Sequence, residues 1–299
     1  MLEHLNSDEW QLQLISLYVW IEEGFRQRGW RFLVERFSQA GEPVFKDEEV
    51  LTAFIFARLR GHHTYKGGWS FLRNFLLEWF PQLPRYSAWI DRIHRLVPVL
   101  LKASEELTGT FCYQKEDQFL IDSCPIVMAR GTRASRAKVA PELATRGYCA
   151  SKSMHFYGIK FHAIVRNRPG QLPEPVAFGV SPASSHDLQA LKACIDEFNH
   201  GQLFADLAYD CKSTSEKMGK NGCELCTPRK KTKGKFHFPG PDSYSRAVSK
   251  IRHPVETFFS WLQEKAQFQT AYRVRSEKGL LTFIWSSLLI GLLSFSVPS

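Results

Sequence analysis

The sequence predicts a mixed α/β domain that follows an all-helical domain. Over the first third of the chain, apolar residues recur at helical spacing. Three β-rich segments come next, over residues 118–126, 156–165 and 175–180, and they are followed by a helix, a short apolar strand and further helices. We therefore expect residues 1–112 to form a helical domain and residues 113–299 to form a mixed sheet flanked by helices.

Four helices are expected in the N-terminal domain, over residues 8–28, 47–59, 67–79 and 87–102. In the second helix, acids stand at the start and arginines at the end, as the helix dipole prefers. The fourth helix carries basic residues on or near the face opposite its apolar residues. Such a domain is either a helix-turn-helix reader of DNA or a helical bundle with solvated arginines.

A carboxylate stands in the middle of the first predicted strand. Strand formers flank Asp122 on both sides, and Pro125 limits how far a central strand could continue. Burying an unpaired carboxylate is costly, so Asp122 is expected to have a partner, which is a base, backbone donors or a metal ion.

Two further acids come in comparable settings. Asp206 follows the apolar run of residues 203–205, and a helical pattern before that run places it at the carboxyl end of a strand, where open α/β sheets bind ligands. Asp210 is an alternative, but it precedes a polar segment and is expected to be a cap or turn residue. Glu256 opens a helical pattern, with Pro254 suited to its first turn.

The second predicted strand carries two candidate polar residues. Lys160 and His162 share one face, because side chains alternate along a strand. A structural role is expected for His162 in preference to metal binding. The helix after the third strand begins near Asp187, and either Asp187 or Ser185 is expected to cap it.

Two segments are rich in cations. Residues 129–155 hold six lysines and arginines and are expected to form a long loop, which either follows a phosphate backbone or is simply solvated. Residues 229–235 form the densest positive run, and the aromatic side chains of residues 236–238 follow it directly. Such rings could stack on the bases of a single strand, and a solvated loop is the alternative.

Composition limits the classes of protein to consider. The 299 residues carry a formal net charge of +9, which favours a polyanionic partner such as nucleic acid or an anionic membrane surface. The 7 cysteines are odd in number, and the chain starts without a secretory signal, so we expect a reducing compartment and no disulfide framework. Cys223 and Cys226 have half of a zinc-ligand spacing and are expected to be ordinary strand residues.

The last 21 residues, 279–299, contain no charged side chain. Their length and composition fit a membrane span, with cations on one flank. The alternative is a buried terminal helix that closes the second domain. We expect the buried helix and no membrane contact.

The predicted order of elements describes a ribonuclease H-like α/β fold, and five segments carry a family resemblance. They are FLIDS, YGIKFH, SHD, ADLAY and RHPVETF, at residues 119–123, 157–162, 185–187, 205–209 and 252–258. Each segment is short, but the ordered set resembles the DDE-type transposases of bacterial insertion sequences and extends over about two thirds of the chain.

The resemblance implies a set of site residues. Asp122, Asp206 and Glu256 would be the catalytic triad and would hold two divalent ions, Mg²⁺ with Mn²⁺ as a substitute. The cations that the resemblance and the charge pattern bring near DNA are Lys160, Arg229, Lys230, Lys231 and Arg252. Leu207 departs from the family pattern, in which many relatives carry a lysine or arginine, and this departure removes one expected DNA contact.

The resemblance also implies a function. A transposase would bind the terminal inverted repeats of its insertion sequence as double-stranded DNA, cut next to them and transfer the freed strand to target DNA. Because two DNA ends must be handled together, we expect a homodimer on DNA, in the bacterial cytoplasm and associated with the nucleoid. Two alternatives remain open, a nuclease of the same fold without joining activity and a non-catalytic DNA-binding regulator derived from a transposase.

Overall fold

The computed structural model describes residues 9–35, 41, 43–108, 117–150, 152–195, 198–230 and 242–296. The chain divides into two compact units. Unit 1 comprises Met1–Leu107, Lys265–Phe268 and Ser276–Ser299, and unit 2 comprises Thr108–Glu264 and Gln269–Arg275. The division that we expected after residue 112 placed the C-terminal helix with the sheet, whereas this grouping places it with the N-terminal helices.

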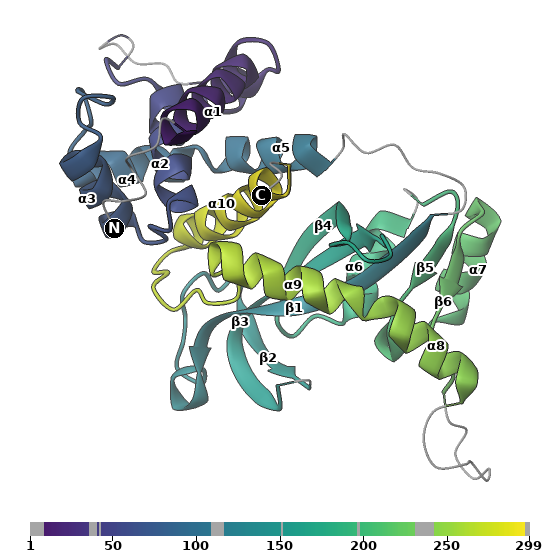
Figure 1. Cartoon of the computed structure of the whole chain (residues 1–299). Coiled ribbons are helices and arrows are strands. Elements are labelled where there is room, and N and C mark those ends of the chain that lie inside the picture. Colours follow the sequence, from purple (N-terminus) through teal and green to yellow (C-terminus); the bar gives the residue numbers. More distant parts are fainter. Residues whose placement is uncertain are drawn as a thin grey trace. The chain divides into compact units, whose positions relative to one another are not determined.

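Unit 1 is helical. Its elements are α1 (Glu9–Arg26), η2 (Trp30–Leu33), α2 (Asp47–Leu59), α3 (Tyr65–Phe75), α4 (Tyr86–Arg95), α5 (Val97–Thr108) and α10 (Glu277–Ser296) (Figure 1). The fourth helix expected from the sequence is broken at Leu96 into α4 and α5. Pro98 explains the break, because proline lacks the N–H that a continuous helix needs and clashes with the carbonyl four residues earlier.

Helix α10 is a core helix of unit 1. By length and composition it could cross a membrane, but 67% of its apolar window is buried inside the protein. It packs against α2 and α4, and the buried Arg58 of α2 donates to the hydroxyl of Ser287 at 2.6 Å. The segment is therefore a buried helix, as the second of our two interpretations proposed, but it is grouped with the N-terminal helices and does not close the domain that contains the sheet.

Unit 2 is built on a six-stranded mixed sheet. The strands are β1 (Gln118–Arg130), β2 (Thr145–Cys149), β3 (Met154–Arg166), β4 (Glu174–Pro182), β5 (Gln202–Phe204) and β6 (Glu224–Cys226). Their order is β2-β3-β1-β5-β6, and β4 pairs with the same strand β3 as β2 does. The pairs that involve β3 are antiparallel, whereas β5 runs parallel to both β1 and β6.

The cation-rich segment of residues 129–155 is not the uninterrupted loop that we expected. It contains the 3₁₀ turn η3 (Gly131–Arg133) and the edge strand β2. β2 pairs with the first half of β3, and β4 pairs with the second half, so the two strands follow one another along the outer edge of β3.

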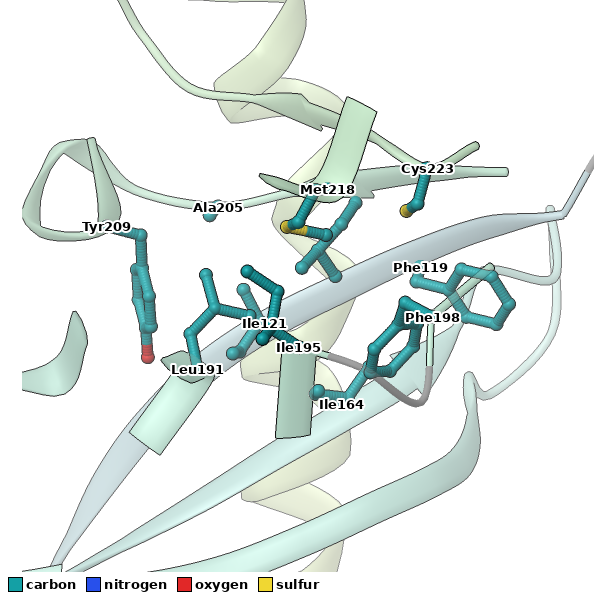
Figure 2. Close-up of a cluster of buried hydrophobic side chains, with 11 residues drawn as sticks. Phe119, Ile121, Ile164, Leu191, Ile195, Phe198, Ala205, Tyr209, Met218 and Cys223 are labelled. Atoms are coloured by element: carbon teal, nitrogen blue, oxygen red, sulfur yellow. The ribbon is translucent and has the colours of Figure 1, made fainter. Parts of the chain in front are cut away.

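Helices cover both faces of this sheet. The elements are α6 (Asp187–Cys194), η5 (Leu207–Tyr209), α7 (Lys212–Asn221), α8 (Ser243–Arg252) and α9 (Pro254–Ala266). Phe119 and Ile121 of β1 point into an apolar cluster with Leu191 of α6 and Met218 of α7 (Figure 2). On the other face, the ring of Phe259 in α9 meets that of Phe161 in β3, with centroids 6.4 Å apart.

The register between β1 and β3 decides which side chains share a face. Asp122 lies opposite Ala163, and Val127 lies opposite Gly158. A Cβ atom at Gly158 would lie 2.1 Å from the carbonyl oxygen of Ile126, so only glycine allows the strands to approach as they do. Directly paired residues of antiparallel strands point to the same side, which puts Asp122 on the face that α8 and α9 cover.

Candidate active site

Asp122 is a largely buried carboxylate in β1, with 20% of its side chain exposed. Its Oδ1 accepts a hydrogen bond from the backbone N–H of Ser123 at 2.8 Å, and its Oδ2 accepts one from the guanidinium of Arg252. Burial raises the pKa of Asp122 to about 6, although Arg252 and the Ser123 N–H both favour the charged form. The expectation that this acid has a partner is confirmed, and in this structure the partner is an arginine.

Arg252 joins two of the three acids. It is the last residue of α8, and Glu256 lies in the first turn of α9, one helical turn further along the chain. Arg252 Nη2 donates to Glu256 Oε1 at 3.1 Å while the Nη1 atom donates to Asp122. Burial lowers the pKa of Arg252, but Asp122, Glu256 and Asp206 outweigh it and raise the pKa above its usual range.

Asp206 reaches the same place from the neighbouring strand. Leu120 of β1 pairs with Phe204 of the parallel strand β5, so two residues further along each chain Asp122 and Asp206 come abreast. Asp206 Oδ1 accepts from the N–H of Ala208 at 2.8 Å, which caps η5 and fixes the carboxylate. The charge of Asp206 also contributes to the raised pKa of Asp122.

The site therefore holds three carboxylates and one guanidinium. If all four groups are ionised, the formal charge is −2, in a place where Asp122 and Arg252 are largely buried. Carboxylate oxygens are the donors that Mg²⁺ and Mn²⁺ prefer, so the donor chemistry fits the expected ions. Among the described residues, no three acid, histidine or cysteine side chains are already gathered around one point, and the guanidinium stands between Asp122 and Glu256.

Tyr209 is a site residue that we had not singled out, although it lies within the ADLAY segment. Its ring is fully buried beside Leu191 (Figure 2), and among the described residues its hydroxyl has no hydrogen-bond partner. Burial raises its pKa well above the usual value, and the charges of Asp187, Asp122 and Asp206 raise it further. Tyr209 is therefore a neutral phenol held close to the acids.

Lys160 and His162 lie on the other face of the sheet from Asp122. Lys160 Nζ donates to the carbonyl of Ser185 and to Asp187 Oδ1, both at 2.9 Å. His162 Nε2 is 2.7 Å from the hydroxyl of Ser181. A DNA contact by Lys160 stays a prediction, but in this structure its ammonium is engaged away from the three acids.

The cap of α6 differs from our expectation. The N-cap residue is His186, whose Nδ1 accepts from the N–H of Leu188 at 3.4 Å. Asp187 forms the ion pair with Lys160 instead. Capping by Asp187 or Ser185 was therefore wrong, because an imidazole nitrogen can accept the same hydrogen bond.

The remaining candidates lie near the end of β6 and the start of α8. Asp210, the alternative to Asp206, pairs with Lys230 at 3.3 Å, and both side chains are well exposed. Arg229 lies over the ring of Tyr244, 4.9 Å from its centroid. Lys231 lies outside the described residues.

Comparison with known proteins is consistent with this geometry. A family model described as "Transposase DDE domain" matches residues 114–276, more than half of the chain, and this span includes all three acids and Arg252. No curated protein matches the chain. The family resemblance and the ribonuclease H-like mixed sheet, expected from the sequence, are confirmed. The chain belongs to the transposase DDE domain family.

Proposed function

We propose that this transposase binds the terminal inverted repeats of an insertion sequence and carries out metal-dependent strand cleavage and strand transfer. The observation that supports the proposal most directly is the convergence of Asp122, Asp206 and Glu256 from β1, the end of β5 and the start of α9 around one guanidinium. Three acids from three elements exceed what one arginine neutralises, and such an excess suits a site for divalent cations.

In this proposal, Asp122, Asp206 and Glu256 hold two Mg²⁺ ions, or Mn²⁺ in their place. When bound, such a pair of ions activates a water or a 3′-hydroxyl group and stabilises the leaving oxygen of a phosphodiester. The short turn η5 orients Asp206 through its cap. Arg252 would exchange its carboxylate partners for a phosphate of the bound strand.

Other cations contribute to DNA binding in the proposal. Arg229 and Lys230 sit at the start of the basic run, and Lys231 continues it in the sequence. Lys160 is the weakest member of the expected set, since it would have to leave Asp187. The helices of unit 1 would read the terminal repeats, and a homodimer would hold the two ends, in the cytoplasm near the nucleoid.

The first test is cleavage of labelled duplex taken from the DNA that flanks the gene, with and without Mg²⁺ or Mn²⁺. Alanine at Asp122, Asp206 or Glu256 should lower the cleavage rate by about 10³-fold or more, because bound ions contribute several kcal/mol to such transition states. Terminal-repeat binding should survive. Asp210→Ala is the matched control and should cleave normally.

Retained cleavage in the Asp206→Ala protein, with loss in Asp210→Ala, would show that the wrong acid was assigned. Joining is tested separately with ends that are already cut. Products joined to target DNA support a transposase, whereas hydrolysis alone indicates a nuclease. Specific binding that no metal converts into cleavage would indicate a regulator.

A further inference from the structure

A cavity of about 300 Å³ opens in unit 2 beside the β2–β3 hairpin. The hairpin contributes Arg146, Tyr148, His155 and Phe156 to its lining, and the turn after β1 contributes Gly131 and Ser135. None of these residues belongs to the three-acid site, so the proposed cleavage chemistry leaves the cavity without a role.

The walls of the cavity have two aromatic rings that remain accessible. Tyr148 and His155 are directly paired across the hairpin, and their ring centroids lie 4.8 Å apart with planes inclined by 49°. Tyr148 is 52% exposed although it is a large aromatic side chain. Exposed rings at a cavity mouth are suited to stacking on a flat ligand.

The basic composition of the segment that carries most of the lining favours an anionic ligand. From residue 130 to residue 152, the chain has six lysines and arginines and a single acid, Glu142. The guanidinium of Arg146 lies in the lining and donates to the carbonyl of Ser135, which holds it at the cavity wall. Accessible rings among cations are the combination that binds single-stranded nucleic acid, in which the rings stack on bases and the cations neutralise phosphates.

The hairpin contacts the segment that directly follows β4. A Cβ atom at Gly147 would lie 2.4 Å from the carbonyl oxygen of Ala183, so the two chains touch at this point. Thr145 Oγ1 also accepts a hydrogen bond from the N–H of Ser184 at 2.9 Å. Tyr148 and His155 are thus carried on paired strands that pack against the segment after β4, and such a support lowers the entropic cost of ordering a ligand.

The cavity also lies on the same face of the sheet as the three acids. Side chains alternate along β3, so His155 points to the same side as Ala163, which lies opposite Asp122. Eight residues of strand separate these two positions, or about 26 Å measured along β3. A DNA strand with its reacting phosphate at Asp122 would have a base at the cavity after about eight nucleotides, at roughly 3.4 Å for each stacked nucleotide.

We propose that this cavity binds one unpaired nucleobase of the DNA, which stacks on Tyr148 and His155 and has Arg146 beside its edge. Its position relative to the reacting phosphate rests on the proposed function. The ligand class itself rests only on the rings, the cations and the cavity.

The first experiment uses the full-length protein in EDTA and measures fluorescence anisotropy of a labelled oligothymidylate and of a labelled duplex. Tyr148→Ala should weaken oligothymidylate binding about tenfold, because a lost base–ring stack has effects of this order. Tyr148→Phe keeps the ring and should bind like the wild type. His155→Ala should lose several-fold, and none of these variants should change duplex binding or the thermal unfolding temperature by much.

The second experiment locates the base. A single 2-aminopurine is moved along the DNA away from the cleavage position, and its fluorescence reports unstacking from neighbouring bases. The largest protein-dependent change should fall about eight nucleotides from the reacting phosphate, by the strand spacing given above, and should disappear in Tyr148→Ala.

The outcomes separate the two proposals. Equal oligothymidylate affinities for the wild type, Tyr148→Ala and His155→Ala would overturn the nucleobase site, as would equal losses on single strand and duplex. If the Tyr148 effect is present but metal-dependent cleavage is absent, the nucleobase site stands and the proposed function fails.

Discussion

Two of the ion pairs on strands β1 and β3 lie on opposite faces of the sheet, and they are alike in exposure but differ in the number of acids around the cation. Asp122 pairs with Arg252, and Asp187 pairs with Lys160, and in both pairs the cation is 17% exposed and the acid 20%. Lys160 donates hydrogen bonds to one carboxylate and one backbone carbonyl. Arg252 donates hydrogen bonds to Asp122 and Glu256, and the charge of Asp206 also raises its pKa.

The difference lies in the number of acids for each cation. The Lys160–Asp187 pair is neutral, and each of its two ions already has an opposite charge, so the pair has no electrostatic need for a further ligand. The cluster of Asp122, Asp206, Glu256 and Arg252 has two negative charges in excess when all four groups are ionised, and a second cation would relieve the repulsion between the acids. The two pairs are equally buried, so burial does not separate them, whereas the number of acids around the cation does.

The largest predicted effect concerns the pH dependence of stability, and it comes from His162, which shares a face of the sheet with Lys160. Burial lowers its pKa from 6.5 to about 4, with Asp187 opposing the shift and Lys160 adding to it. Between these two pH values, His162 therefore binds a proton in the unfolded chain but not in the folded protein. His162 should therefore contribute a loss of up to about 3 kcal/mol in the free energy of unfolding as the pH drops from about 6.5 to about 4. The raised pKa of Asp122 acts in the opposite direction over the same interval, so the contribution of His162 is read from the difference between the wild type and His162→Gln.

Urea unfolding at several pH values checks this prediction. His162→Gln has no imidazole to protonate and should lose correspondingly less stability over the same pH interval. Parallel stability curves for the two proteins would show that His162 does not resist protonation in the folded state.

A somewhat smaller effect is expected from breaking the neutral pair. Asp187→Ala leaves Lys160 largely buried without its carboxylate, and should lower the free energy of unfolding by about 2 kcal/mol. The double variant Lys160→Met, Asp187→Leu removes both charges and should recover most of that loss.

Glu216→Ala is the control for this measurement in urea. Its pair with Lys212 is mostly solvent-exposed, so its removal should leave stability nearly unchanged. If Asp187→Ala proves as mild as Glu216→Ala, the Lys160–Asp187 pair is not the closed structural pair described here.

The smallest predicted effect concerns the Mn²⁺ affinity of the cluster that holds Arg252. Arg252→Gln removes the cation that stands between Asp122 and Glu256, and should raise Mn²⁺ affinity about tenfold, equivalent to about 1.4 kcal/mol. The free Mn²⁺ signal in electron paramagnetic resonance measures the affinity without any cleavage. Arg229→Gln removes a cation that stacks on Tyr244 and serves as the charge-matched control.

Unchanged or weaker Mn²⁺ binding in Arg252→Gln would mean that the guanidinium does not compete with the ion. Absence of binding to every variant, including the wild type, would count against the metal site itself.

The sequence was informative wherever a local pattern settles the structure. Asp122 lies within β1, Asp206 lies just past β5, and Glu256 lies in the first turn of α9, each in the element that its apolar neighbours predicted. Apolar runs and a helix-starting proline are local signals, and the nearest neighbours decide them. Convergence of the three acids was inferred from the family resemblance and not from those patterns.

Long-range pairing set the limits of sequence-based prediction. Alternation showed that Lys160 and His162 share a face, but whether Asp122 shares it depends on the β1–β3 register, which is a property of both strands together. Strand β2 was missed because its sequence, TRGYC, lacks an apolar alternation. The partners of α10 could not be predicted either, because the sequence of a uniformly apolar helix does not indicate which distant helices pack against it.

The close approach at Gly158 has an evolutionary consequence. A side chain at this position would push β1 away from β3 at Ile126, only four residues from Asp122. Selection for the position of Asp122 would then act on a residue that has no side chain of its own. An invariant glycine at position 158 would reflect the close spacing of β1 and β3. Loss of activity on its substitution in a mutational scan would not make it a catalytic residue.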